Sequence, residues 1–253
     1  MRTKVLATLA AAALLPMVSA APAQANHSWN GYHWARTANP FTLQLGDNVS
    51  AAWDSHLATA SSDWSKSTVL DTVVAAGNTR PRNCKATTGR VEVCNSTYGS
   101  TGWLGVASIS VTGGSHITAG TVKLNDTYFN TATYDTPEWR QLVTCQEVGH
   151  TFGLDHQDEN FDNANLGTCM DYTNDPSTNQ HPNSHDYDEL VTIYSHLDDS
   201  TTVGITSSRQ QPQVGSDPST WGKRVEGSRA TGHSTFVRDF GHGNYVVTFV
   251  TWA

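Results

Sequence analysis

The sequence predicts an α+β fold, because strand-like apolar runs alternate with capped segments of helical periodicity. A third observation concerns the C-terminal part, where residues 201–233 are rich in Ser, Thr, Gly, Gln and Pro and show no period. Two further strand-like runs follow this segment. We therefore expect one domain over residues 26–200, and a linker with a C-terminal β-hairpin arm over residues 201–253.

The first 25 residues have the organisation of a secretory signal peptide. Arg2 and Lys4 precede an apolar run rich in Ala and Leu, and small residues lead to cleavage sites after Ala20 or Ala25. A membrane anchor is the alternative, but the run is shorter than the roughly 20 residues that a bilayer requires, and Pro16 interrupts it. The sequence predicts a secreted, extracellular protein without a membrane partner.

Charge argues against a nucleic-acid partner. Without the signal peptide the chain carries 13 Lys plus Arg against 23 Asp plus Glu, a formal charge of −10. About 228 residues remain, which is enough for one sizeable domain with its own core.

Four cysteines in an exported chain favour two disulfides over free thiols. Three connectivities are possible. We favour Cys84 with Cys94, which closes a short loop, and Cys145 with Cys169, which ties together two segments of interest for function. Both bonds are expected to be structural.

The first half of the domain is expected to be mainly β-structure. Strands are predicted over residues 41–49, 69–77, 90–95, 103–111 and 116–125. The run 116–125 is more polar than its neighbour, as an edge strand would be. Residues 50–66 place Trp53, Leu57 and Trp64 at helical spacing, which predicts a packed helix.

Two helices are expected in the second half. The first begins with Asp135 or Thr136 as cap and Pro137 in its first turn, and it ends near Gly153. The second begins at Ser184. At the C-terminus, residues 234–240 and 244–252 are separated by Gly-His-Gly and are typical of a β-hairpin.

The first of these helices carries a pattern suited to metal binding. Gln146 and His150 are one helical turn apart and share a face, and Glu147 lies between them. Gly153 permits a sharp turn that can return His156 as a third ligand. Glu147 would face the open coordination position as a general base for metal-bound water.

Residues 147–156, EVGHTFGLDH, resemble the HExxHxxGxxH motif of metzincin metalloproteases, with Gln146 at the place of its first His. The Met-turn of that clan is matched by residues 169–172, CMDY, which follow His156 in the right order. The flanking runs TAGTVKLN and SHDYDELVTIY are similar to the matrixin-like branch. The resemblance covers roughly residues 41–197.

This resemblance implies a metzincin-like domain with a twisted, mostly parallel sheet, an active-site helix, a Met-turn and a C-terminal helix. It implies a zinc endopeptidase acting on protein or peptide substrates, which would pair with the strand 116–125. Met170 is expected to pack beneath the metal. Tyr172 is expected to bind zinc reversibly or to hydrogen-bond the tetrahedral intermediate, and a packed core tyrosine is the alternative.

Gln146 leaves an alternative open, because glutamine is an uncommon zinc ligand. Its amide oxygen can bind zinc from the same helix face, or the site is degenerate and the protein is a non-catalytic zinc-retaining or protein-binding pseudoenzyme on the same fold. His116, His181 and His185 lack the helical spacing to replace Gln146, and we expect them at the surface. A structural adhesion protein that uses residues 201–253 is a third hypothesis.

Calcium is a second candidate cofactor. The acidic residues Asp155, Asp158, Glu159 and Asp162 could bind Ca²⁺, but they lack the glycine-punctuated pattern of a dedicated loop. A solvated acidic face is the simpler interpretation.

Overall fold

The computed structural model describes residues 26–207 and 211–253, so the predicted signal peptide lies outside the described residues. Within them the chain forms an α+β fold with a sheet of nine strands and four α-helices, as the sequence predicts. No helix in these two ranges is long and apolar enough to cross a membrane.

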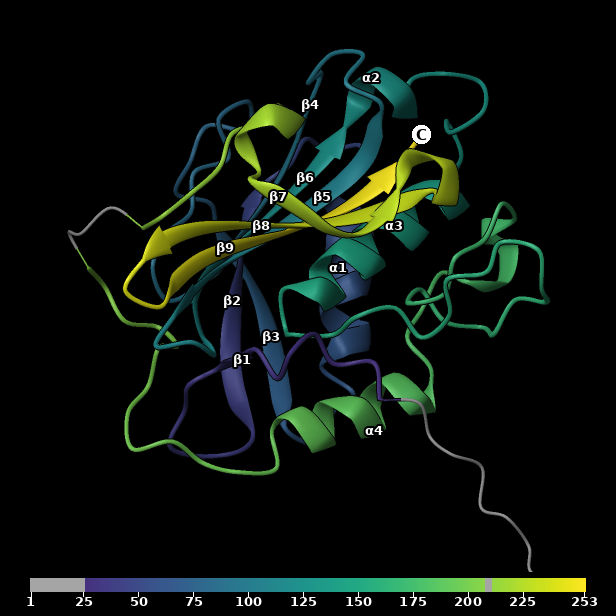
Figure 1. The fold of residues 1–253 in the computed structure, drawn as a ribbon. Helices are drawn as coiled ribbons and strands as arrows, with labels where there is room; N and C mark the ends of the chain where they lie inside the picture. Colours follow the sequence, from purple (N-terminus) through teal and green to yellow (C-terminus); the bar gives the residue numbers. More distant parts are fainter. Residues whose placement is uncertain (1–25, 208–210) are drawn as a thin grey trace, which may run out of the picture.

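The strand order of the sheet is β3-β2-β4-β6-β5-β9-β8-β7, and β1 also pairs with β6. The strands are β1 (His33–Trp34), β2 (Phe41–Asn48), β3 (Leu70–Ala76), β4 (Val91–Ser96), β5 (Trp103–Thr112), β6 (His116–Asn125), β7 (Lys223–Ser228), β8 (His233–Gly241) and β9 (Asn244–Trp252). The sheet twists strongly, so that β2 and β3 run across the direction of β8 and β9 (Figure 1).

The expectation of a mostly parallel sheet is wrong, because the sheet is mixed. Pairings among β1, β2, β3, β4 and β6 are parallel. Those along β6-β5-β9-β8-β7 are antiparallel. The antiparallel half is large because the C-terminal strands, expected as a separate arm, extend the main sheet.

The expectation that residues 116–125 form an edge strand is also wrong. β6 lies between β4 and β5 and is almost entirely buried. Its polar side chains are covered by the segment that precedes β7: Lys123 Nζ donates to the Gly215 carbonyl (3.3 Å) and Thr118 Oγ1 to Gln211 Oε1 (2.9 Å). Polarity in this strand therefore reflects contact with another part of the chain.

The helices are α1 (Asp54–Trp64), α2 (Asp126–Phe129), α3 (Pro137–His150) and α4 (Ser184–Ile193). α3 begins as predicted, since the Thr136 side chain accepts a hydrogen bond from the Trp139 amide and Pro137 opens the first turn. α4 begins at Ser184, as expected, and is capped by Asn183. α2 was not predicted.

Close packing joins α1 to α3. Trp64 Nε1 donates to the Cys145 carbonyl (3.1 Å), and a side chain at Gly149 would lie 2.6 Å from the Trp64 ring and 2.8 Å from Met170 Sδ. Only glycine fits there. This contact fixes the position of the helix that carries Gln146 and His150.

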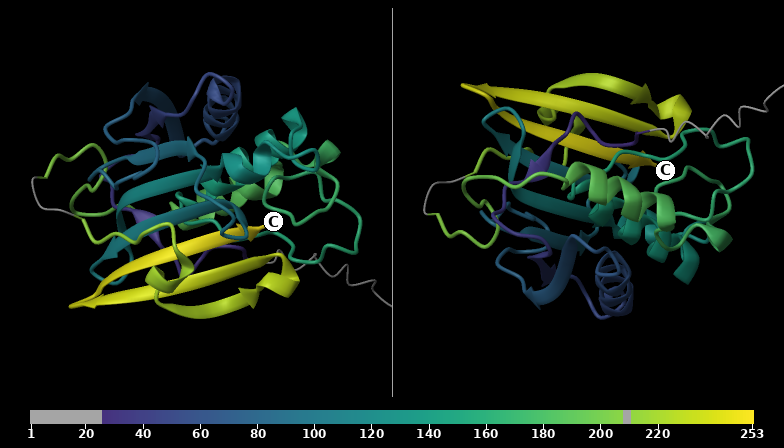
Figure 2. Two further views of the ribbon diagram at one scale, coloured as in Figure 1. Left: turned by 90° about the horizontal axis from the view of Figure 1, so that it is seen from above. Right: turned by 90° about the horizontal axis from the view of Figure 1, so that it is seen from below.

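The C-terminal residues form the predicted hairpin and one additional strand, β7. β8 and β9 are joined through the turn at Gly241–Gly243, and β9 pairs with β5 over most of its length. β7 adds a third strand inside the segment expected to be a linker. Figure 2 shows the three strands continuing one side of the sheet. Val247 and Phe249 belong to the main hydrophobic core.

Both predicted disulfides form, Cys84 with Cys94 and Cys145 with Cys169. Each of the four cysteines is buried. The second bond links α3 to the segment that carries Met170 and Tyr172, as expected from the sequence.

Candidate metal centre

His150 and His156 are brought together by the end of α3 and the turn that follows. Gly153 has φ of +95°, and a Cβ there would lie 1.9 Å from the Tyr32 carbonyl oxygen. No other residue fits this turn without moving the backbone. The chain reverses at Gly153 and returns His156 to the end of the helix.

The two imidazoles face one another through Nε2 atoms 3.0 Å apart. His150 Nδ1 lies 2.9 Å from the Leu154 carbonyl oxygen, which can only accept, so Nδ1 carries the proton and Nε2 presents its lone pair. Burial lowers the pKa of His150 to about 3 and that of His156 well below its ordinary value. Both rings are therefore neutral near pH 7, the state that binds a metal.

The other ring nitrogen of His156 is surrounded by oxygen atoms. The Tyr172 hydroxyl lies 2.8 Å from Nδ1, and Asp155 Oδ1 lies 3.3 Å from it. With its proton on Nδ1, His156 donates to one of these oxygens and presents a free Nε2. With its proton on Nε2, the ring donates to His150 instead.

Tyr172 contacts the back of His156 and is almost fully buried. Its ring contacts both His156, with ring centroids 4.0 Å apart, and His233, with centroids 4.5 Å apart. Burial raises the pKa of Tyr172 well above its usual value, so the phenol keeps its proton. In this arrangement the tyrosine orients His156.

Gln146 lies one turn before His150 and is buried. Its Nε2 donates to the Cys169 carbonyl (3.0 Å), and its Oε1 accepts from Thr251 Oγ1 on β9 (2.9 Å). The orientation of the Gln146 side-chain amide is assigned from the Cys169 carbonyl oxygen, which can only accept, so the Gln146 NH₂ group must face it. The structure thus brings His150 and His156 together and turns the Gln146 oxygen toward β9.

Glu147 is fully buried beside Gln146. Thr251 Oγ1 lies 2.7 Å from Glu147 Oε1, while Oε2 has no hydrogen-bond partner among the residues that the structure describes. Burial raises the pKa of Glu147 to about 8, against the smaller lowering effect of the Thr251 hydrogen bond. Near pH 7 the carboxyl group is mainly protonated, so it can donate to Thr251, which in turn donates to Gln146.

β9 covers this site from the side of β5. The Phe249 ring stacks on the His150 imidazole, with centroids 4.4 Å apart and an interplanar angle of 5°. Thr251, two residues later on the same strand face, contacts Gln146 and Glu147. The C-terminal strand therefore contacts the three residues of α3 on which the expected chemistry depends.

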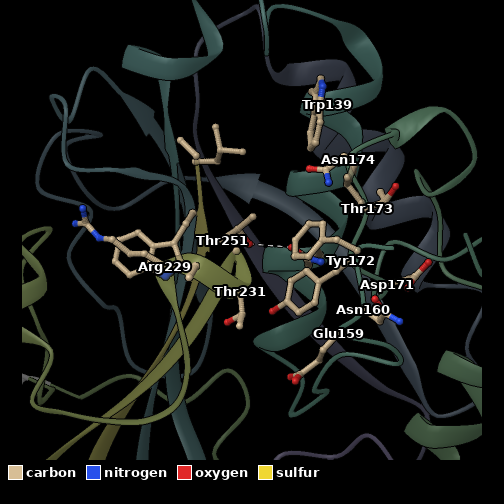
Figure 3. A pocket seen from close by; sticks show the side chains of 18 of the residues that line it. Trp139, Glu159, Asn160, Asp171, Tyr172, Thr173, Asn174, Arg229, Thr231 and Thr251 are labelled. Carbon is tan, nitrogen blue, oxygen red and sulfur yellow. Dashed lines mark hydrogen bonds between the residues drawn. The ribbon is translucent and has the colours of Figure 1, made fainter. Parts of the chain in front are cut away.

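A cavity of about 480 Å³ opens beside the site. Gln146 and Tyr172 contribute to its wall, and Thr251 and Arg229 from the C-terminal part lie across it from Thr173 (Figure 3). Other lining residues include Trp139, Leu142, Glu159, Asn160, Phe161, Asn174 and Trp252. The cavity is large enough for one or two side chains of a peptide.

Met170 is fully buried, in contact range of Gly149 on α3. The three alternative histidines have partners elsewhere. His116 Nε2 lies 3.2 Å from Asp198, His181 Nδ1 lies 2.6 Å from Asp63, and the His185 ring stacks on His27. None of these contacts involves His150 or His156.

The acidic residues after α3 separate into two groups. Asp155 and Glu159 face His156, and one ligand atom from each of the three lies within 4.8 Å of the others. Asp158 instead accepts hydrogen bonds from Asn160 and Asn163, and the Asp162 amide donates to the Asn160 side chain. Asp155 and Glu159 therefore belong to the candidate metal centre, because they contact His156.

No family model matches the chain, and no curated protein matches it. Sequence reasoning missed Thr251, Phe249 and His233, which all come from the C-terminal strands. The alternation in residues 244–252 identified a strand, but its partner strand lies more than 130 residues earlier and leaves no local signal in the sequence.

Proposed function

We propose that the chain is a secreted zinc-dependent endopeptidase of the metzincin type whose site is covered by its own strand β9. The observation that carries the proposal is the 3.0 Å separation of the His150 and His156 Nε2 atoms. Two ligands of a tetrahedral zinc at about 2.0 to 2.1 Å lie roughly 3.3 Å apart. Two contacts support the same assignment. The Leu154 carbonyl fixes the tautomer of His150, and the Tyr172 hydroxyl lies beside Nδ1 of His156.

Gln146 is the third ligand in this proposal, through its amide oxygen. Its place one turn before His150 gives it the required helix face. This oxygen accepts from the Thr251 hydroxyl, and its second lone pair would bind the metal. Bound zinc would acidify a water molecule and polarise the scissile carbonyl.

Glu147 is the general base of the proposed reaction. A base must be ionised, and the burial of Glu147 under β9 favours the protonated form. Moving Thr251 and Phe249 away would admit water, restore the carboxylate and expose His150. We therefore propose that the enzyme is latent until β9 leaves the site.

Substrate would take the place of β9. The outer edge of β5 now pairs with β9 in an antiparallel ladder. An extended peptide can make the same main-chain hydrogen bonds with that edge. This replaces the earlier expectation that residues 116–125 receive the substrate, because β6 has no free edge.

The second candidate is a non-catalytic zinc-retaining or protein-binding module. The observation that favours it is the same cover: Gln146 and Glu147 both have a hydrogen-bond partner on β9, and Phe249 is part of the main core. In such a protein the strand would stay in place permanently.

The two candidates differ in zinc content combined with peptide cleavage. Zinc per chain and hydrolysis of an unfolded protein would be measured for wild type, Thr251→Ala and Thr251→Ala combined with Glu147→Gln. We expect zinc in all three, faster cleavage by Thr251→Ala, and loss of at least roughly 100-fold on adding Glu147→Gln. Zinc without cleavage in any variant would establish the non-catalytic module. Unchanged zinc content in the Gln146→Ala and His150→Ala variants would contradict zinc binding at this centre in either candidate.

A further inference from the structure

Four metal-type side chains meet at a second place in the fold, where β1, the start of β6 and the chain after α4 come together. These are His33, His116, His196 and Asp198. His33 and His116 face each other in the parallel pairing of β1 with β6. The segment after α4 runs beside β1, since the Asp198 amide donates to the Arg36 carbonyl (2.9 Å). In Figure 1 this is the meeting of the purple N-terminal segment with the green chain that follows α4.

The ligand atoms converge on one carboxylate oxygen. Asp198 Oδ1 lies 3.2 Å from His116 Nε2, 3.5 Å from His33 Nε2 and 3.7 Å from His196 Nε2. His33 Nε2 and His196 Nε2 lie 3.2 Å apart. Ligands of a tetrahedral zinc at about 2.0 to 2.1 Å are separated by roughly 3.3 Å, and the three distances among His33, His196 and Asp198 match such a site.

His33 presents its Nε2 lone pair to this point. Its Nδ1 lies 2.8 Å from the Gly31 carbonyl oxygen, which can only accept, so the proton is on Nδ1. The His33 side chain is 7% exposed and the Asp198 side chain 10%. Supporting hydrogen bonds of this kind fix the tautomer of metal-binding histidines.

Arg36 holds the Asp198 carboxylate in the matching orientation. Its Nη1 lies 3.0 Å and its backbone nitrogen 3.1 Å from Asp198 Oδ2. Arg36 is itself buried and also donates to the His196 carbonyl. The charge of Asp198 is therefore already balanced by Arg36, which leaves Oδ1 directed at the three imidazoles.

We propose that His33, His196 and Asp198 form a binding site for Zn²⁺. Two imidazole nitrogens and one carboxylate oxygen suit zinc, whereas Ca²⁺ and Mg²⁺ take oxygen ligands. The ion would join the N-terminal strand to the chain after α4, so its role is structural. The half-exposed His196 gives the ion a path from solvent. This inference stands apart from the proposed peptidase function, since the two sites share no residue.

The test is zinc binding by the full chain. Zinc per chain after loading and desalting would be measured for wild type, His196→Ala and Asp198→Asn. His242→Asn is the matched control, because His242 lies in the hairpin turn with φ of +54°, which asparagine tolerates. Co²⁺ absorption would report tetrahedral coordination, and Ca²⁺ would serve as the negative probe.

We expect His196→Ala to lose one zinc per chain and to weaken binding there by more than roughly 100-fold, beyond the 10- to 100-fold typical when only a residue supporting a ligand changes. The zinc-dependent rise in unfolding temperature should shrink in the same variant and persist in His242→Asn. If His196→Ala and Asp198→Asn bind as much Zn²⁺ and Co²⁺ as the control, no metal site exists here. If only His150→Ala lowers the zinc content per chain, the result supports zinc at the proposed peptidase centre and contradicts zinc at His33, His196 and Asp198. If only His196→Ala and Asp198→Asn lower it, the result supports this site and contradicts the other.

Discussion

Glu147 is the residue whose chemistry depends most on its surroundings. Burial raises its pKa from 4.5 to about 8, so between these values the folded protein holds a proton that the unfolded chain releases. The stability contributed by Glu147 therefore falls as pH rises through this range. His150 acts in the opposite sense: its pKa drops from 6.5 to about 3, so its contribution is lost as pH falls below 6.5. His156 behaves in the same way.

We predict that the chelator-treated protein is most stable near pH 6.5. Below this value the two histidines outweigh Glu147. Above it stability falls through Glu147, until about pH 8, and through His233, whose pKa is raised by Glu159 against the effect of burial. The Glu147→Gln variant should lose the Glu147 share of this decline, a slope of at most about 1.4 kcal/mol per pH unit. Urea unfolding between pH 5 and 9 measures it, with His242→Asn as control. Equal slopes for the variant and wild type would mean that Glu147 ionises normally.

Gln146 is the second residue whose identity can be tested alone. We predict that Gln146→His binds zinc more tightly, by roughly tenfold or more, because an imidazole is a stronger donor at the same helix position. Gln146→Ala should weaken binding, since only His150 and His156 remain. Gln141→Ala on the same helix is the control, as Gln141 is also buried and hydrogen-bonds His56. Chelator competition gives the affinities. Wild-type affinity in the Ala variant would make Gln146 a bystander.

At the scale of elements, local signals located most helices and strands. Thr136 and Pro137 gave the start of α3, and the spacing of Trp53, Leu57 and Trp64 gave α1. These signals act within a few residues, so the sequence contains them directly. The spacing of His150, Gly153 and His156 likewise predicted that the chain reverses at Gly153 and returns His156 to the helix, because glycine readily takes the positive φ that this turn has.

Pairing between distant elements could not be predicted. β6 was expected at an edge because it contains Thr118, Thr121 and Lys123, yet residues 211–215 cover this face. β9 was expected in a separate arm and instead pairs with β5. Neither contact depends on residues near in sequence, so polarity and periodicity alone do not distinguish solvent from a remote segment.

We predict that fixing β9 to β5 prevents cleavage. Ser108 on β5 and Thr248 on β9 are directly opposite and buried, with hydroxyl oxygens 3.0 Å apart. In a Ser108→Cys and Thr248→Cys pair, the two cysteines should form a disulfide cross-link. Added to Thr251→Ala, this pair should lower the cleavage rate tenfold or more, which corresponds to about 1.4 kcal/mol in the barrier. The Ser108→Ala and Thr248→Ala pair controls for the lost hydroxyls. Undiminished cleavage by the cross-linked chain would show that β9 need not move.

For the whole molecule, the two disulfides stabilise different regions. Cys84–Cys94 lies in the parallel half of the sheet, beside β4. Cys145–Cys169 joins α3 to the segment of Met170, and the backbone of both cysteines also holds neighbours: the Cys145 carbonyl accepts from Trp64 and the Cys169 carbonyl from Gln146. The second bond therefore couples the stability of the fold to the geometry of the proposed metal centre.

We predict that removing either disulfide lowers the unfolding free energy, but that only removing Cys145–Cys169 also weakens zinc retention. Replacing either cysteine pair by alanine should cost about 3 kcal/mol of unfolding free energy, because the closed loops of 10 and 24 residues differ little in chain entropy. Only the Cys145→Ala and Cys169→Ala pair should also speed zinc release, since it frees the carbonyl that orients Gln146. Urea unfolding and zinc release to a chelator would be measured on both variants, each serving as the control for the other. If zinc leaves both at the same rate, general destabilisation explains the loss, and the disulfide beneath α3 has no specific part in shaping the centre.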